Sequence, residues 1–500
     1  MKIRLIEPAA PSLHMWSYSH YPRLGLPMIG ATLKAAGHDV RIYCPQIAPI
    51  DMADVHSAEL VGLSTTTSTA PAAYEIADEL RARRIPTVIG GSHVTFMANE
   101  ALEHADFVAR GEGGEALVLE LVEALRGRRE LETIRGLSFT RDGRPVHNEP
   151  RERCPNLDEL PVPDLPLIVG SEKLRSTPIM TSWGCPFACN FCSVTAMFGR
   201  RYRYRSPEHV IAELEAKRPR RIFFYDDNFA ADRRRLKILL GLMIERDLVV
   251  PWSAQVRTDV ADDAELLILM RRSGCERLSL GLESVNQATL DGYNKAQSVD
   301  DIARAIDTLH DCGIMCHGMF VLGADSDTVD TVRDTVEFAL RHRIDSLMLN
   351  ILTPGPGTGQ LADMNAEGRI FDGHWQLYDG QHVVFTPRQM TPHELQVEVL
   401  RGYARFYSSR RWLRQFLALR YVGLLVHSWG WWYARLWPRD RSNRAYLKRL
   451  PRLRLVASRP PPAGCTPPVS GECSSQVARR TPALRDHRVR AELERTRRSP

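Results

Sequence analysis

The sequence predicts two α/β units in one chain, a doubly wound N-terminal domain and a partial (β/α)6 barrel, followed by a helical C-terminal extension. Two patterns and the length predict this order. Short β-branched runs alternate with segments of helical spacing over residues 1–130, and a second series of six such repeats begins near residue 176. The 500 residues exceed what one hydrophobic core usually organises.

The five strands expected in the first unit read KIRLIEP, DVRIYCP, LVGLSTTT, TVIGGSHV and FVARGEG. Continuous apolar runs of this length are typical of parallel strands that are buried on both faces. Helical spacing over residues 28–36 and 72–84 separates the strands. We therefore expect a doubly wound domain over residues 1–140, with its ligand at the carboxyl ends of the strands.

Residues 141–175 are rich in proline and charge and lack a sustained period, which predicts a linker. A barrel is expected over 176–365, because six βα units follow one another there and would gather their chemistry at the carboxyl ends of the strands. Its strands are predicted at 178–182, 221–226, 252–257, 277–283, 316–322 and 346–352, and its helices at 207–216, 233–244, 262–272, 299–310 and 328–341.

The C-terminal region 366–455 is predicted to be mixed and helical, and it is basic and rich in tryptophan. Its apolar stretch cannot span a bilayer, because it is interrupted by Arg410, Arg411, Arg414, Arg420 and Arg435. Two interpretations remain open, a helical subdomain packed on the barrel and an element that lies on a membrane surface. The second would use Trp412, Phe416, Leu419, Leu424, Trp429, Trp431 and Trp432. The tail 456–500 is rich in proline, serine and arginine and is expected to be disordered.

The net charge is +6, and most of the ten cysteines are widely scattered. The only tight cysteine group has metal-ligand spacing, which fits a reducing compartment better than a disulfide framework. The start, MKIRLIEPAAPS, lacks the succession of segments that a secretion signal has. These features predict a cytoplasmic protein. The basic C-terminal region adds the alternatives of a plain solvated surface and of peripheral contact with the inner face of the membrane.

The strongest motif is TSWGCPFACNFCSVT, in which Cys185, Cys189 and Cys192 directly follow the first predicted barrel strand. Three thiolates on one loop can bind three irons of a [4Fe–4S] cluster and leave the fourth iron open. A structural zinc site usually needs four closed ligands, and no partner pair lies close by. We therefore predict an iron–sulfur cluster on this loop. The cysteines interpreted as core thiols, and not as ligands, are Cys275, Cys312 and Cys316.

This motif resembles the signature of the radical S-adenosylmethionine superfamily, including an aromatic residue, Phe191, before the last cysteine. The resemblance implies that S-adenosylmethionine chelates the open iron and is cleaved to a 5′-deoxyadenosyl radical, which abstracts a substrate hydrogen. It also implies contacts to S-adenosylmethionine at later strand ends, where acceptors suit an ammonium and arginine suits a carboxylate. The residues at those positions are Asp226, Asp227, Asn228, Arg257, Glu283 and Ser284.

An α/β domain in front of this barrel resembles the cobalamin-binding radical enzymes over roughly residues 1–400, which implies a Rossmann-like cobalamin domain. The likeness rests on PRLGLPMIGATLKAAGHDV, LVGLSTTT, VIGGSHVT and ARGEGGEAL. By this resemblance, the residues expected to bind cobalamin are Ser64, Gly90, Gly91, Gly111 and Glu112. Paired glycines let backbone approach a flat macrocycle closely. The Asp-x-His-x-x-Gly motif is absent, so the lower ligand of cobalt is left open and His93 is not assigned to it. Another nucleotide is the alternative ligand, although no Gly-x-Gly-x-x-Gly follows the first strand.

The two cofactors together imply methylation of an unactivated carbon of a lipid or natural-product substrate, through the 5′-deoxyadenosyl radical and methylcobalamin. The alternative reaction is a radical oxidative cyclisation or rearrangement of a natural-product or tetrapyrrole-like substrate. The alternative of another class is a non-enzymatic cobalamin-dependent sensor, against which the three intact cysteines argue. Expected partners are the small-molecule substrate and a reductase, flavodoxin or ferredoxin as electron donor, with no nucleic acid. No catalytic residue beyond the cluster ligands is assigned.

Overall fold

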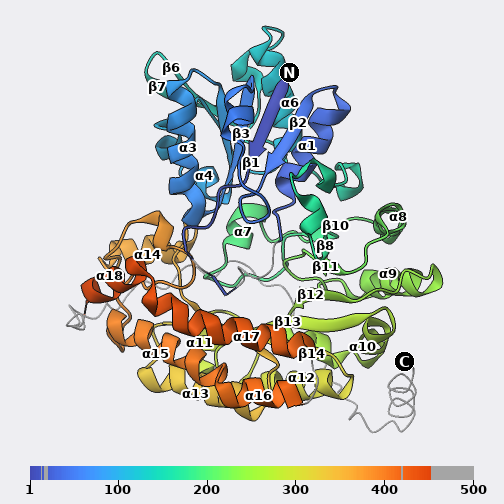
Figure 1. Ribbon diagram of the computed structural model, residues 1–500, viewed down its shortest axis with the longest axis vertical. Coiled ribbons are helices and arrows are strands. Elements are labelled where there is room, and N and C mark those ends of the chain that lie inside the picture. Colours follow the sequence, from blue (N-terminus) through green and yellow to red (C-terminus); the bar gives the residue numbers. More distant parts are fainter. Residues whose placement is uncertain (13, 16–20, 418–420, 452–500) are drawn as a thin grey trace, which may run out of the picture.

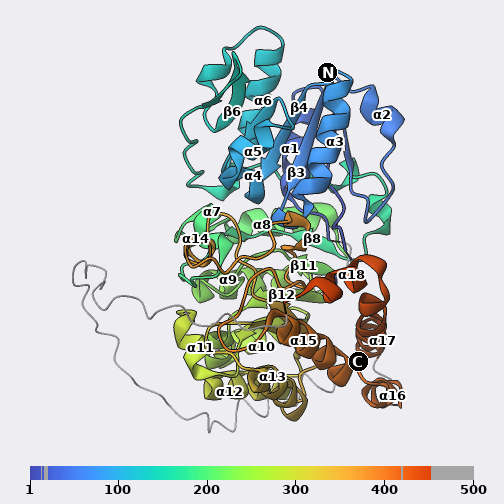
Figure 2. The same ribbon diagram turned by 90° about the vertical axis from the view of Figure 1, so that its left-hand side faces the viewer.

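The computed structural model describes residues 1–451 apart from 13, 16–20 and 418–420. The N-terminal unit stands above the barrel, and the C-terminal helices cross one side of the barrel (Figure 1, Figure 2). The predictions for the tail 456–500, Leu419 and Arg420 lie outside the described residues.

The N-terminal unit is built around a seven-stranded sheet with the order β2-β1-β3-β4-β5-β6-β7. Its parallel strands are β1 (Lys2–Ile6), β2 (Asp39–Tyr43), β3 (Leu60–Thr65), β4 (Thr87–Gly91) and β5 (Phe107–Ala109). One face is covered by α1 (Gly25–Ala35) and α6 (Gly114–Leu125). The other is covered by α2 (Met52–His56), α3 (Ala70–Ala82), α4 (Ser92–Phe96) and α5 (Ala98–Leu102). The predicted doubly wound arrangement is confirmed.

An antiparallel hairpin, β6 (Leu137–Arg141) and β7 (Arg144–His147), extends this sheet beyond β5. β7 lies inside the segment that the sequence predicts to be a linker. No apolar period marks it, because three of its four residues are exposed at the sheet edge. Further along, Ile168 forms a parallel bridge with Ile42, so this connecting segment also runs past the opposite edge of the sheet.

The second unit is a six-stranded, all-parallel sheet in the order β15-β14-β13-β12-β11-β8. The strands are β8 (Thr177–Ile179), β11 (Ile222–Phe224), β12 (Trp252–Val256), β13 (Cys275–Glu283), β14 (Met315–Leu322) and β15 (Ser346–Ile351). The main connecting helices are α8 (Pro207–Lys217), α9 (Arg233–Glu245), α10 (Ala264–Arg272), α12 (Val299–Asp311) and α13 (Val329–Arg341). Because β8 and β15 are the two ends of the sheet, the barrel is open. The predicted partial (β/α)6 barrel is confirmed.

Each of these five helices begins at a polar residue whose side chain accepts a hydrogen bond from a backbone N–H of the first turn. The caps are Ser206, Asp232, Asp263, Ser298 and Thr328. Such caps satisfy donors that a helix leaves free at its start, and each contributes about 1 kcal/mol. The caps therefore fix the residue at which each loop from a strand's carboxyl end passes into the next helix.

The C-terminal region forms α14 (Gly359–Ala366), α15 (Pro392–Phe406), α16 (Ser409–Leu417), α17 (Tyr421–Leu436) and α18 (Arg441–Arg449). α15 packs along the free edge of β15. The Tyr403 hydroxyl accepts from the N–H of Leu349 at 2.9 Å and donates to its carbonyl at 3.1 Å. Tyr407 does the same with Leu347, at 2.8 and 2.7 Å. Side chains of α15 and α17 join the core of the barrel, so one face of this region is a packed helical subdomain. Within the described ranges, every helix is too short or too polar to cross a membrane.

Candidate functional site

A cavity of about 390 Å³ lies between the two units. Its upper wall is formed by the carboxyl ends of β3 and β4 and by the starts of α1 and α6. Its lower wall comes from the beginning of the barrel and from α7 (Ser193–Phe198), which Figure 1 shows between the units. The cavity thus occupies the place where a doubly wound sheet binds its ligand, and it faces the barrel.

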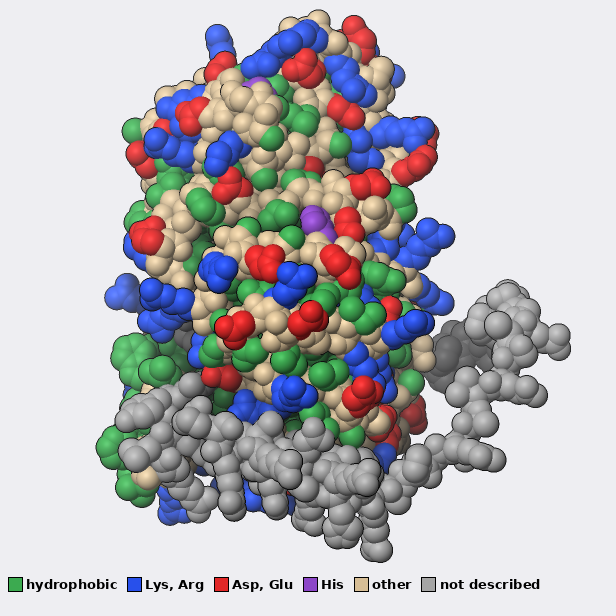
Figure 3. Space-filling model, turned by 90° about the vertical axis from the view of Figure 1, so that its right-hand side faces the viewer, with side chains coloured by type: hydrophobic (Ala, Val, Ile, Leu, Met, Phe, Trp, Pro, Cys, Tyr) green, Lys and Arg blue, Asp and Glu red, His purple; other side chains and the backbone are tan. Residues whose placement is uncertain are grey.

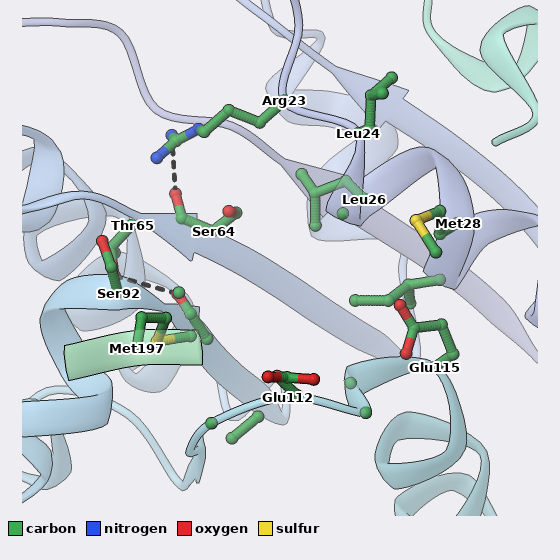
Figure 4. A pocket seen from close by; sticks show the side chains of 18 of the residues that line it. Arg23, Leu24, Leu26, Met28, Ser64, Thr65, Ser92, Glu112, Glu115 and Met197 are labelled. Atoms are coloured by element: carbon green, nitrogen blue, oxygen red, sulfur yellow. Dashed lines mark hydrogen bonds between the residues drawn. The ribbon is translucent and has the colours of Figure 1, made fainter. Parts of the chain in front are cut away.

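All five residues predicted to bind cobalamin line this cavity: Ser64, Gly90, Gly91, Gly111 and Glu112. Figure 4 shows the side chains of Ser64 and Glu112 around the space, together with Met197 of α7. Binding of cobalamin by these residues stays a prediction. Their convergence from separate loops is the arrangement that the prediction requires.

Glu112 also joins the two units. Both of its oxygens accept hydrogen bonds at 2.7 Å from the guanidinium of Arg203, in β10 (Arg203–Tyr204), and both side chains are buried. Arg203 was not predicted as a partner, because 91 positions separate it from Glu112 in the sequence. The carboxylate therefore already has a strong partner, and its first role is to hold the cluster-bearing end of the barrel against the cavity.

Gly91 forms part of the cavity wall in a conformation that needs glycine. Its φ is +112°, and a Cβ placed on it would lie 2.1 Å from the carbonyl oxygen of Thr65 on the neighbouring strand. At Gly90 the nearest atom to an added Cβ would be the Cβ of Ala109, at 3.6 Å, which is ordinary contact. The two glycines therefore differ: Gly91 is required by the approach of β3 and β4, whereas Gly90 keeps the wall flat.

Two charged side chains of the cavity have buried atoms without hydrogen-bond partners among the described residues. They are Nη1 of Arg23 and Oε2 of Glu115. Arg23 also donates from Nη2 to the carbonyl of Ser64 at 3.2 Å and pairs with Glu7 at 3.3 Å. Burial raises the pKa of Glu115. Unfilled polar atoms in a mostly apolar wall suit a large ligand with a few amide groups, and the corrin ring of cobalamin carries such groups. Neither residue was predicted, although both lie in quoted motifs.

The three cysteines of the motif lie on the loop between β9 (Ser182–Trp183) and α7. Cys185, Cys189 and Cys192 are half-buried free thiols, and the N–H of Cys192 donates to the carbonyl of Cys189 at 3.1 Å. Burial is the main cause that raises the pKa of Cys185, and it raises the pKa of Cys192 to about 11. Among the described residues, no three Cys, His, Asp or Glu side chains converge closely enough to hold a metal ion unaided. The donor set still fits a cluster, because ligand ordering and metal binding are coupled and three thiols match three irons.

Asp226 supports the start of this loop. Its Oδ1 accepts from the backbone N–H groups of Thr181 and Ser182, both at 2.7 Å, and its Oδ2 accepts from the Thr181 hydroxyl at 2.7 Å. Burial raises the pKa of this carboxyl, and these three donors oppose the effect. The geometry therefore favours a structural role for Asp226 over the predicted contact to S-adenosylmethionine.

Asp227 and Asn228 are more available than Asp226. Asp227 lines the cavity and, within the described part of the chain, accepts only a long bond, 3.3 Å, from the N–H of Gly184. Burial, and next the charge of Asp226, raise its pKa to about 6. The buried Oδ1 of Asn228 has no partner in the described part of the chain. Asn228 thus has an acceptor available for the methionyl ammonium, and this contact stays a prediction.

Arg257 bridges the cluster loop and the later strands. Its guanidinium carbon lies 3.8 Å from the ring centroid of Phe187, which stands between the first two cysteines of the motif. One terminal nitrogen donates to the carbonyl of Lys295, and Nε has no hydrogen-bond partner among the described residues. Arg257 therefore keeps a donor for the predicted carboxylate next to the cluster loop.

Glu283 and Ser284 end β13 at a bulge. Glu283 has a φ of +63°, and its Oε1 pairs with Nζ of the buried Lys295 at 2.5 Å. The hydroxyl of Ser284 accepts from the N–H of Asn286 at 3.1 Å. Lys295 was not predicted, because it belongs to no motif. Because the ion pair engages Oε1, the other oxygen of Glu283 is the more available acceptor for the predicted contact with S-adenosylmethionine, which stays a prediction.

A second cavity, of about 620 Å³, adjoins the cluster loop at the carboxyl ends of β13, β14 and β15. Phe191 of the motif packs against Tyr293 with ring centroids 4.7 Å apart. The buried hydroxyl of Tyr293 and Oε1 of Gln360 line this cavity without hydrogen-bond partners among the described residues. A space with unfilled polar atoms beside a cluster loop is the natural position for a substrate.

His93 lies outside the cavity between the units. It is buried, its Nε2 is 3.2 Å from Oε1 of Glu100, and its ring meets Trp375 edge-on at 5.1 Å. The indole N–H of Trp375 donates to Oε2 of Glu100 at 3.0 Å. These contacts form a joint between the C-terminal region and the first unit. The three cysteines predicted to be core thiols lie in the barrel core: Cys275, Cys312 and Cys316.

Two family descriptions match this chain. The B12 binding domain matches residues 17–119, and the Radical SAM superfamily matches residues 179–339. The first match begins after β1 and contains β2, β3, β4 and β5. The second begins at the end of β8, just before the cysteine motif.

Several relatives match most of the chain. An uncharacterized methyltransferase of Pyrococcus horikoshii is 30% identical over 81% of this chain and 92% of its own. The anaerobic magnesium-protoporphyrin IX monomethyl ester cyclase of Rubrivivax gelatinosus is 30% identical over 71% and 67%. The hopanoid C-3 methylase of Methylococcus capsulatus is 27% identical over 78% of each chain. The solved radical S-adenosylmethionine methyltransferase TsrM of Kitasatospora setae shares the fold, with a TM-score of 0.61 at 18% identity over 73% of this chain and 75% of that one.

Proposed function

Because the chain belongs to the cobalamin-dependent radical S-adenosylmethionine enzymes, we propose that it methylates an unactivated carbon of a lipid or natural-product substrate. Its cofactors are a [4Fe–4S] cluster, S-adenosylmethionine and cobalamin. When bound, the cluster and S-adenosylmethionine supply hydrogen abstraction, and cobalamin supplies the methyl group.

The proposal is supported by the short helix α7, which connects the cluster loop to the wall of the cavity. α7 starts directly after Cys192, and its residues Ser193, Val194 and Met197 line the cavity. The predicted cobalamin residues and the predicted cluster ligands are therefore separated by one short helix. Such proximity is what hydrogen abstraction and methyl delivery at one carbon require.

The side chains around this wall have two further tasks in the proposal. Trp183, Met197 and Phe198 supply apolar surface that keeps water from the reacting carbon. Asn228 and Arg257 orient S-adenosylmethionine, through an acceptor for its ammonium and a donor for its carboxylate. In the second cavity, Tyr293 and Gln360 offer polar atoms to the substrate.

A lipid is the substrate class that we favour. The hopanoid C-3 methylase is one of the relatives with a named substrate, and the C-terminal region of this chain presents apolar surface to solvent. A cytoplasmic enzyme with peripheral contact to the inner face of the membrane would meet such a substrate. A reductase, flavodoxin or ferredoxin completes the proposal as electron donor.

The test is anaerobic reconstitution with hydroxocobalamin, followed by reaction with S-adenosylmethionine that carries a deuterated methyl group. We expect iron, sulfide and cobalt to be bound, 5′-deoxyadenosine to form, and label to enter the product. Cys189→Ala should lose iron and deoxyadenosine, whereas Cys154→Ala, a free cysteine outside the motif, should keep both. Deoxyadenosine without cobalt, or product without label, would defeat the methylation proposal.

Radical oxidative cyclisation is the second candidate, because the cyclase of Rubrivivax gelatinosus is as similar in identity as the first methyltransferase relative. It would use the same radical-forming residues. A product that gains a ring and no labelled methyl group would favour it.

A further inference from the structure

The helical hairpin of α16 and α17 exposes a group of large apolar side chains. Five of the nine exposed large hydrophobic residues in the described part of the chain lie on it. We call this group the hairpin patch; its members are Leu413, Phe416, Leu417, Leu425 and Trp432. Leu417 and Leu425 are the most exposed, at 70% and 66%. The hairpin lies at the lower right in Figure 2. Figure 3 shows the molecule from the opposite side, so this part lies at the lower left there, where apolar side chains gather.

The opposite side of the hairpin is anchored to the rest of the protein. The indole N–H of Trp429 donates to the carbonyl of Met15 at 2.8 Å, and the guanidinium of Arg411 donates to the carbonyl of Ile344 at 2.9 Å. Within the hairpin, the indole N–H of Trp412 donates to the hydroxyl of Ser428 at 2.8 Å and ties α16 to α17. Trp429 also packs against the barrel core. The apolar interior of the barrel therefore binds one side of the hairpin, and the patch remains on the other as a preformed surface.

Cations dominate the chain around the hairpin patch. Between residues 409 and 450 the sequence has ten arginines and lysines and a single acid, Asp440. Arg410 at the start of α16 is exposed, as are Arg441, Arg444 and Lys448 on α18. An apolar surface beside a strongly cationic one matches a bilayer that carries anionic headgroups.

We propose that the hairpin patch docks the enzyme on an anionic lipid bilayer. The reason for docking, access to a lipid substrate, rests on the proposed function. The surface itself is present whatever the reaction is. The patch enters the boundary between headgroups and acyl chains, and Arg410 of α16 and the exposed cations of α18 contact lipid phosphates. A second copy of the chain fits this surface poorly, because two like-charged hairpins repel each other. A nucleic acid offers phosphates but no partner for five apolar side chains.

The test is flotation of the full-length holoenzyme with vesicles of phosphatidylcholine, with and without phosphatidylglycerol. We expect binding to the anionic vesicles that weakens as salt is raised. The double variant Leu417→Glu, Leu425→Glu should lower the partition coefficient by about tenfold or more. The matched control Ile238→Glu, Val249→Glu changes two apolar residues of the barrel side, 48% and 45% exposed, and should stay within about twofold of the wild type.

Formation of 5′-deoxyadenosine in free solution separates this proposal from the proposed function. The hairpin variant should keep it, because both cavities are lined without patch residues. Equal flotation of the hairpin variant and the wild type would overturn the proposal, as would absence of wild-type binding to anionic vesicles. So would an RNA that displaces vesicles, or sedimentation showing that the patch is covered by a second copy. A wild type that floats but transfers no methyl group would defeat the proposed function and leave the docking surface standing.

Discussion

Replacing Gly91 by alanine is expected to distort the cobalamin cavity and weaken its ligand strongly. The new Cβ would lie 2.1 Å from the carbonyl oxygen of Thr65 and 2.7 Å from its nitrogen, so β3 and β4 must separate. A φ of +112° with ψ of −179° is also a region that only glycine occupies readily, which costs about 1 to 3 kcal/mol. Separating the strands adds about 1 to 3 kcal/mol.

The two costs together amount to about 2 to 6 kcal/mol. They lower the free energy of unfolding of the apo-protein, which urea denaturation measures. Because Gly91 and Thr65 both line the cavity, a loss of about 2 kcal/mol that falls on binding corresponds to about 30-fold weaker affinity for cobalamin. Titration with hydroxocobalamin, followed by visible absorption, gives this second number.

Gly90→Ala separates strain from simple crowding of the cavity. Its added Cβ meets only ordinary contacts, so the stability of the apo-protein should stay within about 0.5 kcal/mol of the wild type even if the ligand binds less well. Unfolding of Gly91→Ala at the same urea concentration as Gly90→Ala would contradict the strain assigned to Gly91. An unchanged affinity of Gly91→Ala for hydroxocobalamin would contradict the expected distortion of the cavity.

Three further predictions concern buried polar groups. Arg203→Ala removes the bidentate partner of the buried Glu112 carboxylate and leaves only the more distant Arg153, at 3.6 Å, so it should cost about 3 kcal/mol in urea unfolding; an unchanged midpoint would contradict this. Trp375→Phe removes the donor to Glu100 but keeps a ring, so we expect the free energy of unfolding to fall by about 1.5 to 3 kcal/mol. Protease cleavage between the units should also become faster. If the indole were exposed to solvent, neither effect would be observed. Burial lowers the pKa of His317 to about 3. Because the unfolded chain takes up this proton below about pH 6.5 and the folded chain does not, the stability present above pH 6.5 should fall by up to about 1.4 kcal/mol per pH unit on acidification toward pH 3. Urea unfolding at about pH 7 and pH 5.5 should show a flatter dependence for His317→Gln.

The residues that local patterns could predict are those at strand ends. In a parallel sheet, an apolar run followed by small or polar residues marks both the strand and the edge where ligands bind. Ser64, Gly91 and Cys185 all follow such runs, and the structure places them around the cavity or on the loop beneath it. The cysteine spacing needed no tertiary information, because all three thiols belong to one loop.

Partners that join separate units could not be predicted in this way. Arg203 reaches Glu112 across 91 positions, and Trp375 reaches Glu100 across 275. Such pairs depend on how the units pack, which neither a hydrophobic period nor a turn signal records. The same limit applies to Asp226, where the sequence indicated a polar strand end but not that three nearby donors occupy its oxygens.

Two tyrosines protect the free edge of β15 against pairing with a strand of another chain. One turn of α15 separates Tyr403 and Tyr407 by a rise of about 6 Å, close to the roughly 6.6 Å between alternate residues of a strand. Their hydroxyls therefore occupy the N–H and carbonyl groups of Leu347 and Leu349 much as a neighbouring strand would. An edge with satisfied groups gives no template for strand addition from another chain. The protection of the β15 edge against strand addition thus rests largely on two phenolic oxygens that line neither cavity.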